Sequence, residues 1–197
     1  MTLYKSRYRV ESTRLQNWNY GWNALYFVTI CTQNKKCHFG EITVDTPNLG
    51  VSTIGISLSI IGEIAKKYWY KIPQHFPFIK LHEFIVMPNH IHGIIEIAKS
   101  DDENETPMFG VETPKLGVST GNTGKKNVKW ESGTLGVIIN QYKRIITINV
   151  RKTDNDFAWQ PRFYDHIIRN EKSYIKISDY IINNPEKWNK DKFYTHN

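Results

Sequence analysis

Residues 84–97 read Phe-Ile-Val-Met-Pro-Asn-His-Ile-His-Gly-Ile-Ile-Glu-Ile, and this stretch decides the fold. Two β-branched apolar runs flank Met87-Pro88-Asn89, a pattern that predicts a hairpin with a tight turn. Because side chains alternate along a strand, His90 and His92 share one face, and residues 91, 93, 95 and 97 face the core. Two imidazoles about 7 Å apart at their Cα atoms can converge on one metal ion. A lone His-x-His is a weak signal, so a purely structural pair is the alternative.

The composition of the whole chain bounds the class of protein. At 197 residues we expect one domain with insertions, and a net charge of +7 with a pI of about 9.3 favours a polyanionic partner such as nucleic acid. The alternative is a basic protein with no such partner. Two cysteines make no disulfide framework, and no apolar run is long enough to span a membrane. We therefore expect a cytoplasmic protein without membrane contact.

Hydrophobic periodicity gives the order of the elements. Strands are expected at 24–33, 78–86, 90–97 and within 157–168, with a short hairpin return at 38–44 and helices at 57–72, 133–152 and 171–184. That order predicts an α+β, ferredoxin-like split βαβ antiparallel sheet with helices on one face, plus a C-terminal helix. RNA-recognition modules share this scaffold, so the fold alone decides no function.

We expect a single domain over residues 24–185, between a basic, aromatic N-terminal arm (1–23) and a basic C-terminal tail (186–197). Two inserted loops, about 44–55 and 99–131, hold the near-repeat Val44–Thr53 and Val111–Thr120, which is identical at eight of ten positions. Two copies are too few for a solenoid, and we assign these loops no chemistry.

The candidates for a nucleophile narrow to tyrosine. Cys31 lies in a core-like strand, and the sequence has no nucleophile elbow and no phosphate-binding glycine loop. Tyr142 is at the centre of the apolar stripe of its helix, which indicates a core position. Tyr180 is at the edge of its helix's apolar line, with Asn184 one turn later. The alternative for this pair is a boundary tyrosine and a helix-capping asparagine.

Two motifs in combination resemble a known family. Met87-Pro88-Asn89-His90-Ile91-His92 resembles the HUH motif of single-tyrosine transposases. Residues 159–171, Trp-Gln-Pro-Arg-Phe-Tyr-Asp-His-Ile-Ile-Arg-Asn-Glu, and 179–185, Asp-Tyr-Ile-Ile-Asn-Asn-Pro, resemble the REP-associated tyrosine transposases in particular. The resemblance implies His90 and His92 as metal ligands, Asn184 as the residue that completes the metal site, and Tyr180 as the catalytic nucleophile. It implies Mg²⁺ or Mn²⁺ as the cofactor.

The function that this resemblance implies is cleavage and rejoining of single-stranded DNA at REP-like palindromic hairpins, through a covalent 5′-phosphotyrosine and a divalent metal. Arg7 and Arg9 of the arm, and Lys143 and Arg144 on a basic helix face, are candidate DNA contacts. Arg162 and Arg169 match family positions suited to strand structure or phosphate contact, and the role of His166 is open.

Two alternatives remain: a catalytically inactive module that binds single-stranded nucleic acid, and a metal-dependent nuclease that uses water. Whether the protein is a monomer or a homodimer is open.

Overall fold

The structure, a computed structural model, describes residues 14–15, 17–45, 53–100 and 133–194, together with the backbone of the short strands β1 (Leu3–Tyr4) and β2 (Arg7–Tyr8). Its centre is a four-stranded antiparallel sheet in the order β6-β7-β3-β8. The strands are β3 (Ala24–Cys31), β6 (Ile79–Val86), β7 (His90–Ile97) and β8 (Tyr164–Ile168). The predicted α+β class and antiparallel sheet are confirmed.

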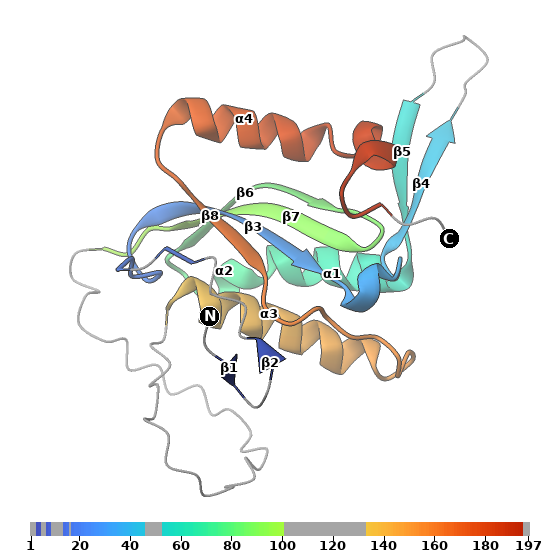
Figure 1. Cartoon of the computed structure of the whole chain (residues 1–197), viewed down its shortest axis with the longest axis horizontal. Coiled ribbons are helices and arrows are strands. Elements are labelled where there is room, and N and C mark those ends of the chain that lie inside the picture. The colour runs from blue at the N-terminus through green and yellow to red at the C-terminus, as the bar shows by residue number, and fades with distance from the viewer. Residues whose placement is uncertain are drawn as a thin grey trace, which may run out of the picture.

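Helices cover both faces of this sheet (Figure 1). The helices α1 (Ile60–Tyr70) and α3 (Leu135–Val150) lie together on one face, and α4 (Glu171–Ile182) crosses the opposite face, called here the α4 face. The two expected core helices and the added C-terminal helix are therefore confirmed. The large core lies under α1 and α3, whereas a small cluster under α4 holds Phe27, Ile94, Ile168 and Ile181.

The alternation in β7 explains both cores. Ile91, Ile95 and Ile97 are fully buried in the large core, as the sequence predicts, and Ile94 points the other way under α4. Gly93 is required on the large-core side because a Cβ there would overlap the Trp69 ring. His90 and His92 consequently lie on the α4 face.

One helix boundary differs from the sequence prediction. Thr53–Leu58 is the strand β5, which pairs with β4 (Gly40–Asp45) in a separate two-stranded sheet. The helix predicted over 57–72 therefore begins only at Ile60, where the Ser59 side chain caps it by accepting from the Gly62 N–H. Residues 57–58 pair with β4 as the end of strand β5, so they do not join the helix. The loop expected at 44–55 joins β4 to β5, and its middle (46–52) and the 101–132 part of the second insertion lie outside the described residues.

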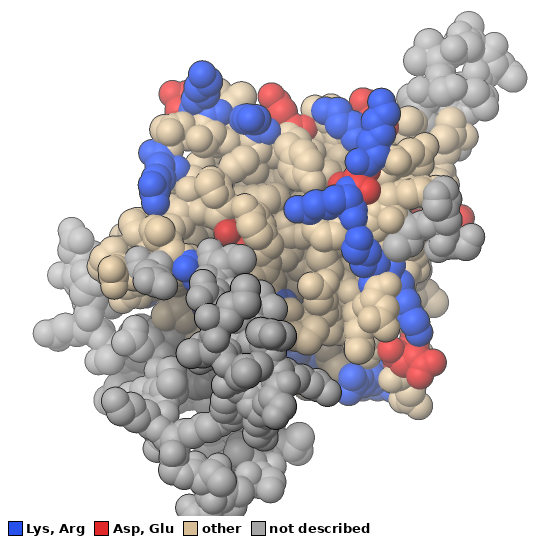
Figure 2. Space-filling view, viewed as in Figure 1, with Lys and Arg blue, Asp and Glu red and all other residues tan. Residues whose placement is uncertain are grey.

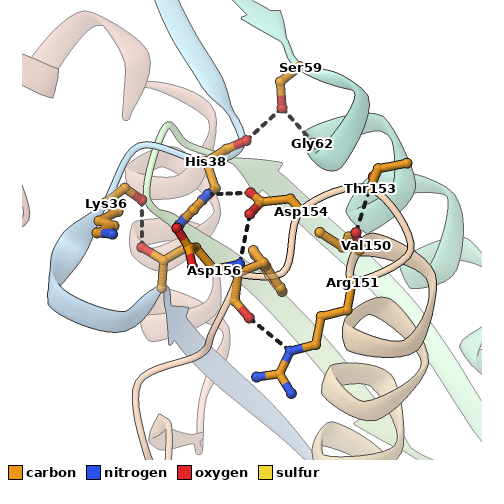
Figure 3. Close-up of polar contacts among 11 residues, drawn as sticks. Lys36, His38, Ser59, Gly62, Val150, Arg151, Thr153, Asp154 and Asp156 are labelled. Atoms are coloured by element: carbon orange, nitrogen blue, oxygen red, sulfur yellow. Dashed lines mark hydrogen bonds and ion pairs between the residues drawn. The ribbon is translucent and has the colours of Figure 1, made fainter.

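The chain between β3 and β4 is tied to both helices of the large core (Figure 3). His38 Nδ1 lies 3.3 Å from the Asp154 carboxylate in the loop after α3, and Ser59 Oγ donates to the His38 carbonyl at 2.6 Å. Thr32 Oγ1 donates to the Lys36 carbonyl at 2.7 Å. These bonds fix the short 3₁₀ turn η1 (Gln33–Lys35), in which Asn34 and Lys35 both have φ of 55°.

The expected boundary at residue 185 is also not where folded structure ends. Asn183 caps α4, and Pro185 then begins the 3₁₀ helix η3 (Pro185–Lys190). Residues 191–194, called here the C-terminal segment, fold back toward the tip of β7, because Trp188 and Phe193 pack their rings against His90.

Pro73 does not end the helical region either, because it occupies the first turn of the short helix α2 (Ile72–His75). At the other end of the chain, residues 17–23 pack on the domain, where Trp18 Nε1 donates to the Tyr26 hydroxyl at 3.2 Å. No helix within the described ranges is long and apolar enough to cross a membrane.

Candidate active site

Two imidazoles from β7 form the centre of the candidate site. His90 and His92 have exposed fractions of 0% and 1%, and their Nε2 atoms lie 3.0 Å apart. Each Nδ1 atom has its own buried partner, Asn89 Oδ1 for His90 and Thr29 Oγ1 for His92, both at 2.9 Å. The predicted pair therefore turns its two Nε2 atoms toward one point, which is the arrangement that two ligands of one ion require.

Tyr180 joins this pair from α4. Its hydroxyl lies 3.2 Å from His92 Nε2, and its ring packs 5.1 Å from the His92 ring and 6.2 Å from Phe27. The side chain is 36% exposed, so the hydroxyl is at a boundary that a substrate can approach. Tyr142 instead lies under the sheet at 3% exposure and donates to the Ala65 carbonyl at 2.9 Å, which confirms its predicted core position.

Asn184 and Asp191 complete the cluster. Asn184 is 1% exposed, its Nδ2 donates to Asp191 Oδ2 at 3.3 Å, and its buried Oδ1 has no hydrogen-bond partner among the described residues. One ligand atom each from His90, His92 and Asp191 lie within 4.8 Å of one another. Asp191 was missing from the sequence prediction. The available signal was a carboxylate seven residues after Asn184, in a segment that we expected to be only a basic tail.

Burial sets the protonation of the cluster. Loss of solvent lowers the pKa of His92 to about 3, and it lowers the pKa of His90 well below its usual value, with His92 and two lysines adding to the effect. The pKa of the Tyr180 phenol is raised, first by burial and then by the Asp191 carboxylate. Near neutral pH both imidazoles are therefore neutral, each with one ring nitrogen that carries a lone pair, and the phenol is protonated.

These donors fit a divalent cation. Nitrogens of the two neutral imidazoles lie close to one carboxylate oxygen of Asp191. Asn184, whose Nδ2 donates to that carboxylate, has a buried Oδ1 without a partner among the described residues. A buried carbonyl oxygen without a partner costs about 1–3 kcal/mol, which an ion in reach would offset. The set of two nitrogens and two oxygens suits several divalent metals and does not by itself select one.

The predicted DNA contacts lie outside this cluster. Lys143, on α3, donates from Nζ to the carbonyls of Gln160 and Arg162, and burial lowers its pKa to about 8. Arg144, Arg162, Arg169 and His166 have exposed side chains, whereas Arg9 and the side chain of Arg7 lie outside the described residues. His166 is opposite Phe27 on the edge strand β8, so it shares the α4 face with the site. These DNA contacts stay predictions.

Cations that the sequence analysis did not single out lie nearer the cluster. Figure 2 shows Lys and Arg side chains gathered over η3 and the C-terminal segment. Lys187, Lys190 and Lys192 are exposed there, and Lys192 Nζ lies 4.8 Å from the Phe193 ring centre. These three lysines make the surface next to the buried histidines positively charged.

Known proteins give the site a context. No protein-family model matches the chain. An uncharacterized protein of Haemophilus influenzae is 36% identical over 188 residues, which are 93% of this chain and 92% of that protein. The chain belongs to the same family as this Haemophilus influenzae protein.

A more distant similarity links the chain to transposases. A REP-associated tyrosine transposase of Escherichia coli is 26% identical over 117 residues, or 59% of this chain, and the match spans only half the length of that protein. The solved structure of a REP-associated tyrosine transposase bound to a REP hairpin aligns with 90% of this chain and 74% of its own, with a TM-score of 0.54 and 18% identity. At that identity the likeness shows a shared fold.

Proposed function

We propose that this protein is a metal-dependent, single-tyrosine transposase of the HUH type that cleaves and rejoins single-stranded DNA at palindromic hairpins. The observation that carries the proposal is the Tyr180 hydroxyl, 3.2 Å from His92 Nε2 and next to the His90–His92–Asp191 cluster. A shared fold with a REP-associated tyrosine transposase, together with the 26% identity to the Escherichia coli REP-associated tyrosine transposase, supports the same proposal.

In the proposed reaction, Tyr180 Oη attacks the scissile phosphorus. A bond from phosphorus to the tyrosine oxygen forms, and the bond from phosphorus to the 3′ oxygen of the upstream strand breaks. The new 5′ end of the downstream strand stays linked to the protein as a 5′-phosphotyrosine. The phenol gives up its proton, and the departing 3′ oxygen takes one to become a hydroxyl. Attack by a 3′-OH on the phosphotyrosine reverses these changes, so rejoining needs no external energy source.

In this reaction, some of the described residues would bind the metal ion and others would orient the tyrosine. His90, His92 and Asp191, with Asn184 Oδ1 as a further donor, would hold a divalent ion, Mg²⁺ or Mn²⁺ in our proposal. Such an ion supplies Lewis-acid stabilisation of charge on the scissile phosphate. Packing of Tyr180 against His92 and Phe27 orients the phenol, and Asp191 lies close enough to the hydroxyl to affect its pKa.

The proposed substrate is a REP-like hairpin with a single-stranded flank. The solved structure that shares this fold is itself bound to a REP hairpin. Lys187, Lys190 and Lys192 lie next to the site and suit the phosphate backbone of a strand entering it, in addition to the arginines expected from sequence.

The test is to incubate the protein with a labelled hairpin strand and Mg²⁺ or Mn²⁺, and to look for a nicked product that carries protein. Tyr180→Phe is expected to abolish the adduct while hairpin binding remains. Tyr142→Phe is the matched control, because its hydroxyl is bonded to Ala65 beneath the sheet, and it should still form the adduct.

The same experiment separates the two alternatives. A nuclease that uses water predicts nicking that survives Tyr180→Phe and leaves no adduct. An inactive binding module predicts salt-sensitive hairpin binding with no nicking in any variant. Loss of the adduct in Tyr142→Phe but not in Tyr180→Phe would contradict the assignment of the nucleophile.

A further inference from the structure

We propose that Asn89 is a positioning residue of the metal site. It holds His90 in the one tautomer that can ligate a metal through Nε2, and it ties that histidine to η1 and to the C-terminal segment. The inference rests on the metal site of the proposed function, and no comparison or motif assigns Asn89 a role.

The orientation of the Asn89 carboxamide is fixed by its surroundings. The side chain is 1% exposed, and its Nδ2 lies 3.0 Å from the Lys35 carbonyl oxygen and 2.8 Å from the Phe193 carbonyl oxygen. Carbonyl oxygens only accept, so the atom that faces them must be the NH₂ group with its two hydrogens. Turning the amide over would set Oδ1 against two carbonyl oxygens, three acceptors with no hydrogen between them.

This orientation decides the tautomer of His90. Oδ1 then faces His90 Nδ1 at 2.9 Å and can only accept, so Nδ1 carries the proton. A neutral imidazole protonated on Nδ1 has its lone pair on Nε2, the atom that points at His92 Nε2. In the other tautomer an N–H would occupy the direction in which a metal must bind.

His92 has no comparable constraint. Its Nδ1 lies 2.9 Å from Thr29 Oγ1, and a hydroxyl can either donate to that nitrogen or accept from it. His92 can therefore donate from Nε2 to His90 Nε2 in the metal-free protein, with the Thr29 hydroxyl donating to Nδ1. It can present its Nε2 lone pair to a metal once its proton is on Nδ1 and the Thr29 hydroxyl has rotated to accept that proton's hydrogen bond. The partner of His92 Nδ1 is a hydroxyl, which can donate or accept, whereas the partner of His90 Nδ1 is an amide oxygen, which only accepts. Only His90 is therefore held in the tautomer that can ligate a metal through Nε2.

The same carboxamide links the ligand to two distant segments. Lys35 lies in η1, three residues before His38, which contacts Ser59 and Asp154 (Figure 3). Thr32 Oγ1, just before η1, is also 3.0 Å from the Asn89 carbonyl oxygen. Phe193 is two residues after Asp191, and its N–H donates to Asp191 Oδ1 at 2.7 Å. Asn89 thus connects the metal-ligating form of His90 to the segment that brings the Asp191 carboxylate.

Three variants separate these roles. Asn89→Leu removes both the acceptor and the donors at similar volume. Asn89→Asp keeps an acceptor toward His90 but loses the donors to Lys35 and Phe193. Asn149→Ala, on α3, is the matched control because that carboxamide bonds only the main chain of its own helix among the contacts described.

The readouts are the protonation of His90 in the metal-free protein, from long-range ¹H–¹⁵N spectra of histidine-labelled samples in EDTA, and Mn²⁺ affinity from the free-ion electron paramagnetic resonance signal. We expect the wild-type protein and Asn149→Ala to have His90 protonated on Nδ1. Asn89→Leu should lose that preference and bind Mn²⁺ about 10- to 100-fold more weakly. Asn89→Asp should retain the proton on Nδ1, while amide exchange at Phe193 becomes faster.

Contrary results are equally specific. A wild-type His90 protonated on Nε2, or unchanged His90 signals and Mn²⁺ affinity in Asn89→Leu, overturns the proposal. If Asn89→Leu does not fold, a proton on Nε2 in Asn89→Asp overturns it instead. None of these measurements uses DNA, so a protein that binds Mn²⁺ as expected but forms no adduct contradicts the proposed function and leaves the role of Asn89 supported.

Discussion

Mild acid should destabilise the metal-free protein through His90 and His92. Both side chains are almost fully buried, and burial lowers both pKa values, that of His92 to about 3. In the unfolded chain a histidine has a pKa of about 6.5. Between pH 6.5 and the lowered pKa, the unfolded state therefore binds protons that the native state does not. The free energy of unfolding is highest above pH 6.5 and falls as the pH drops through that value.

The size of the effect follows from linkage. For a histidine that stays neutral in the native state, moving from pH 7 to pH 5 lowers the free energy of unfolding by about 2 kcal/mol, so the pair accounts for about 4 kcal/mol. That is a large part of the 5–15 kcal/mol typical of a folded domain. The carboxyl groups of Glu83 and Glu96 have lowered pKa values, so the stability they add is lost only below about pH 4.5.

The assay is urea unfolding followed by tryptophan fluorescence at pH 7, 6 and 5, with EDTA present so that metal binding contributes nothing. The double variant His90→Gln/His92→Gln should lose most of the pH dependence, whatever its stability at pH 7. His75→Gln, which removes an exposed histidine, should keep the wild-type dependence. An equal pH dependence in the wild type and the double variant would refute the view that these two histidines are neutral in the native state.

Three further changes test packing and ligation. Gly93→Ala places a methyl group against a buried indole and should destabilise the fold by about 1–3 kcal/mol in urea, whereas Gly55→Ala, which meets only ordinary contact, should not. Lys143→Met removes two hydrogen bonds to main-chain carbonyls and should lower the free energy of unfolding by about 0.5–1.5 kcal/mol, with Arg144→Met as the exposed neighbouring control. Asp191→Asn removes the carboxylate that lies with the two histidines among the described residues and should weaken Mn²⁺ binding by at least about 10-fold; an unchanged affinity would exclude Asp191 as a ligand.

The sheet could be predicted from sequence because its signals are local. The strands expected at 78–86 and 90–97 match β6 and β7, since β-branched alternation and a Met-Pro-Asn turn act over a few residues. The start of α1 could not be found in this way. Residues 57–58 fall within the predicted helix, but they pair with β4, and only the Ser59 cap marks where the helix begins.

In the candidate site, too, the residues with a local sequence signal could be predicted, and the residue placed by long-range packing could not. His90 and His92 can be paired from strand alternation alone, and Tyr180 with Asn184 from helical spacing and a family resemblance. Asp191 was missed because its position depends on η3 turning back after Pro185, which brings together residues about one hundred positions apart in sequence. No local pattern reports such a reversal, since it depends on the packing of Trp188 and Phe193 against His90.

The choice between two helical tyrosines follows from the sheet rather than from the helices. Alternation in β7 sends Ile91 and Ile95 into the large core and His90 and His92 to the α4 face. A side chain on α3 is thus separated from the histidines by the sheet itself, in layers that pack about 10 Å apart. Tyr142 cannot reach the imidazoles without breaking that core, whereas Tyr180 approaches them from the helix that covers their own face. In this fold the histidines lie on one face of the central strand. Only a helix that covers that face can bring a nucleophile to them.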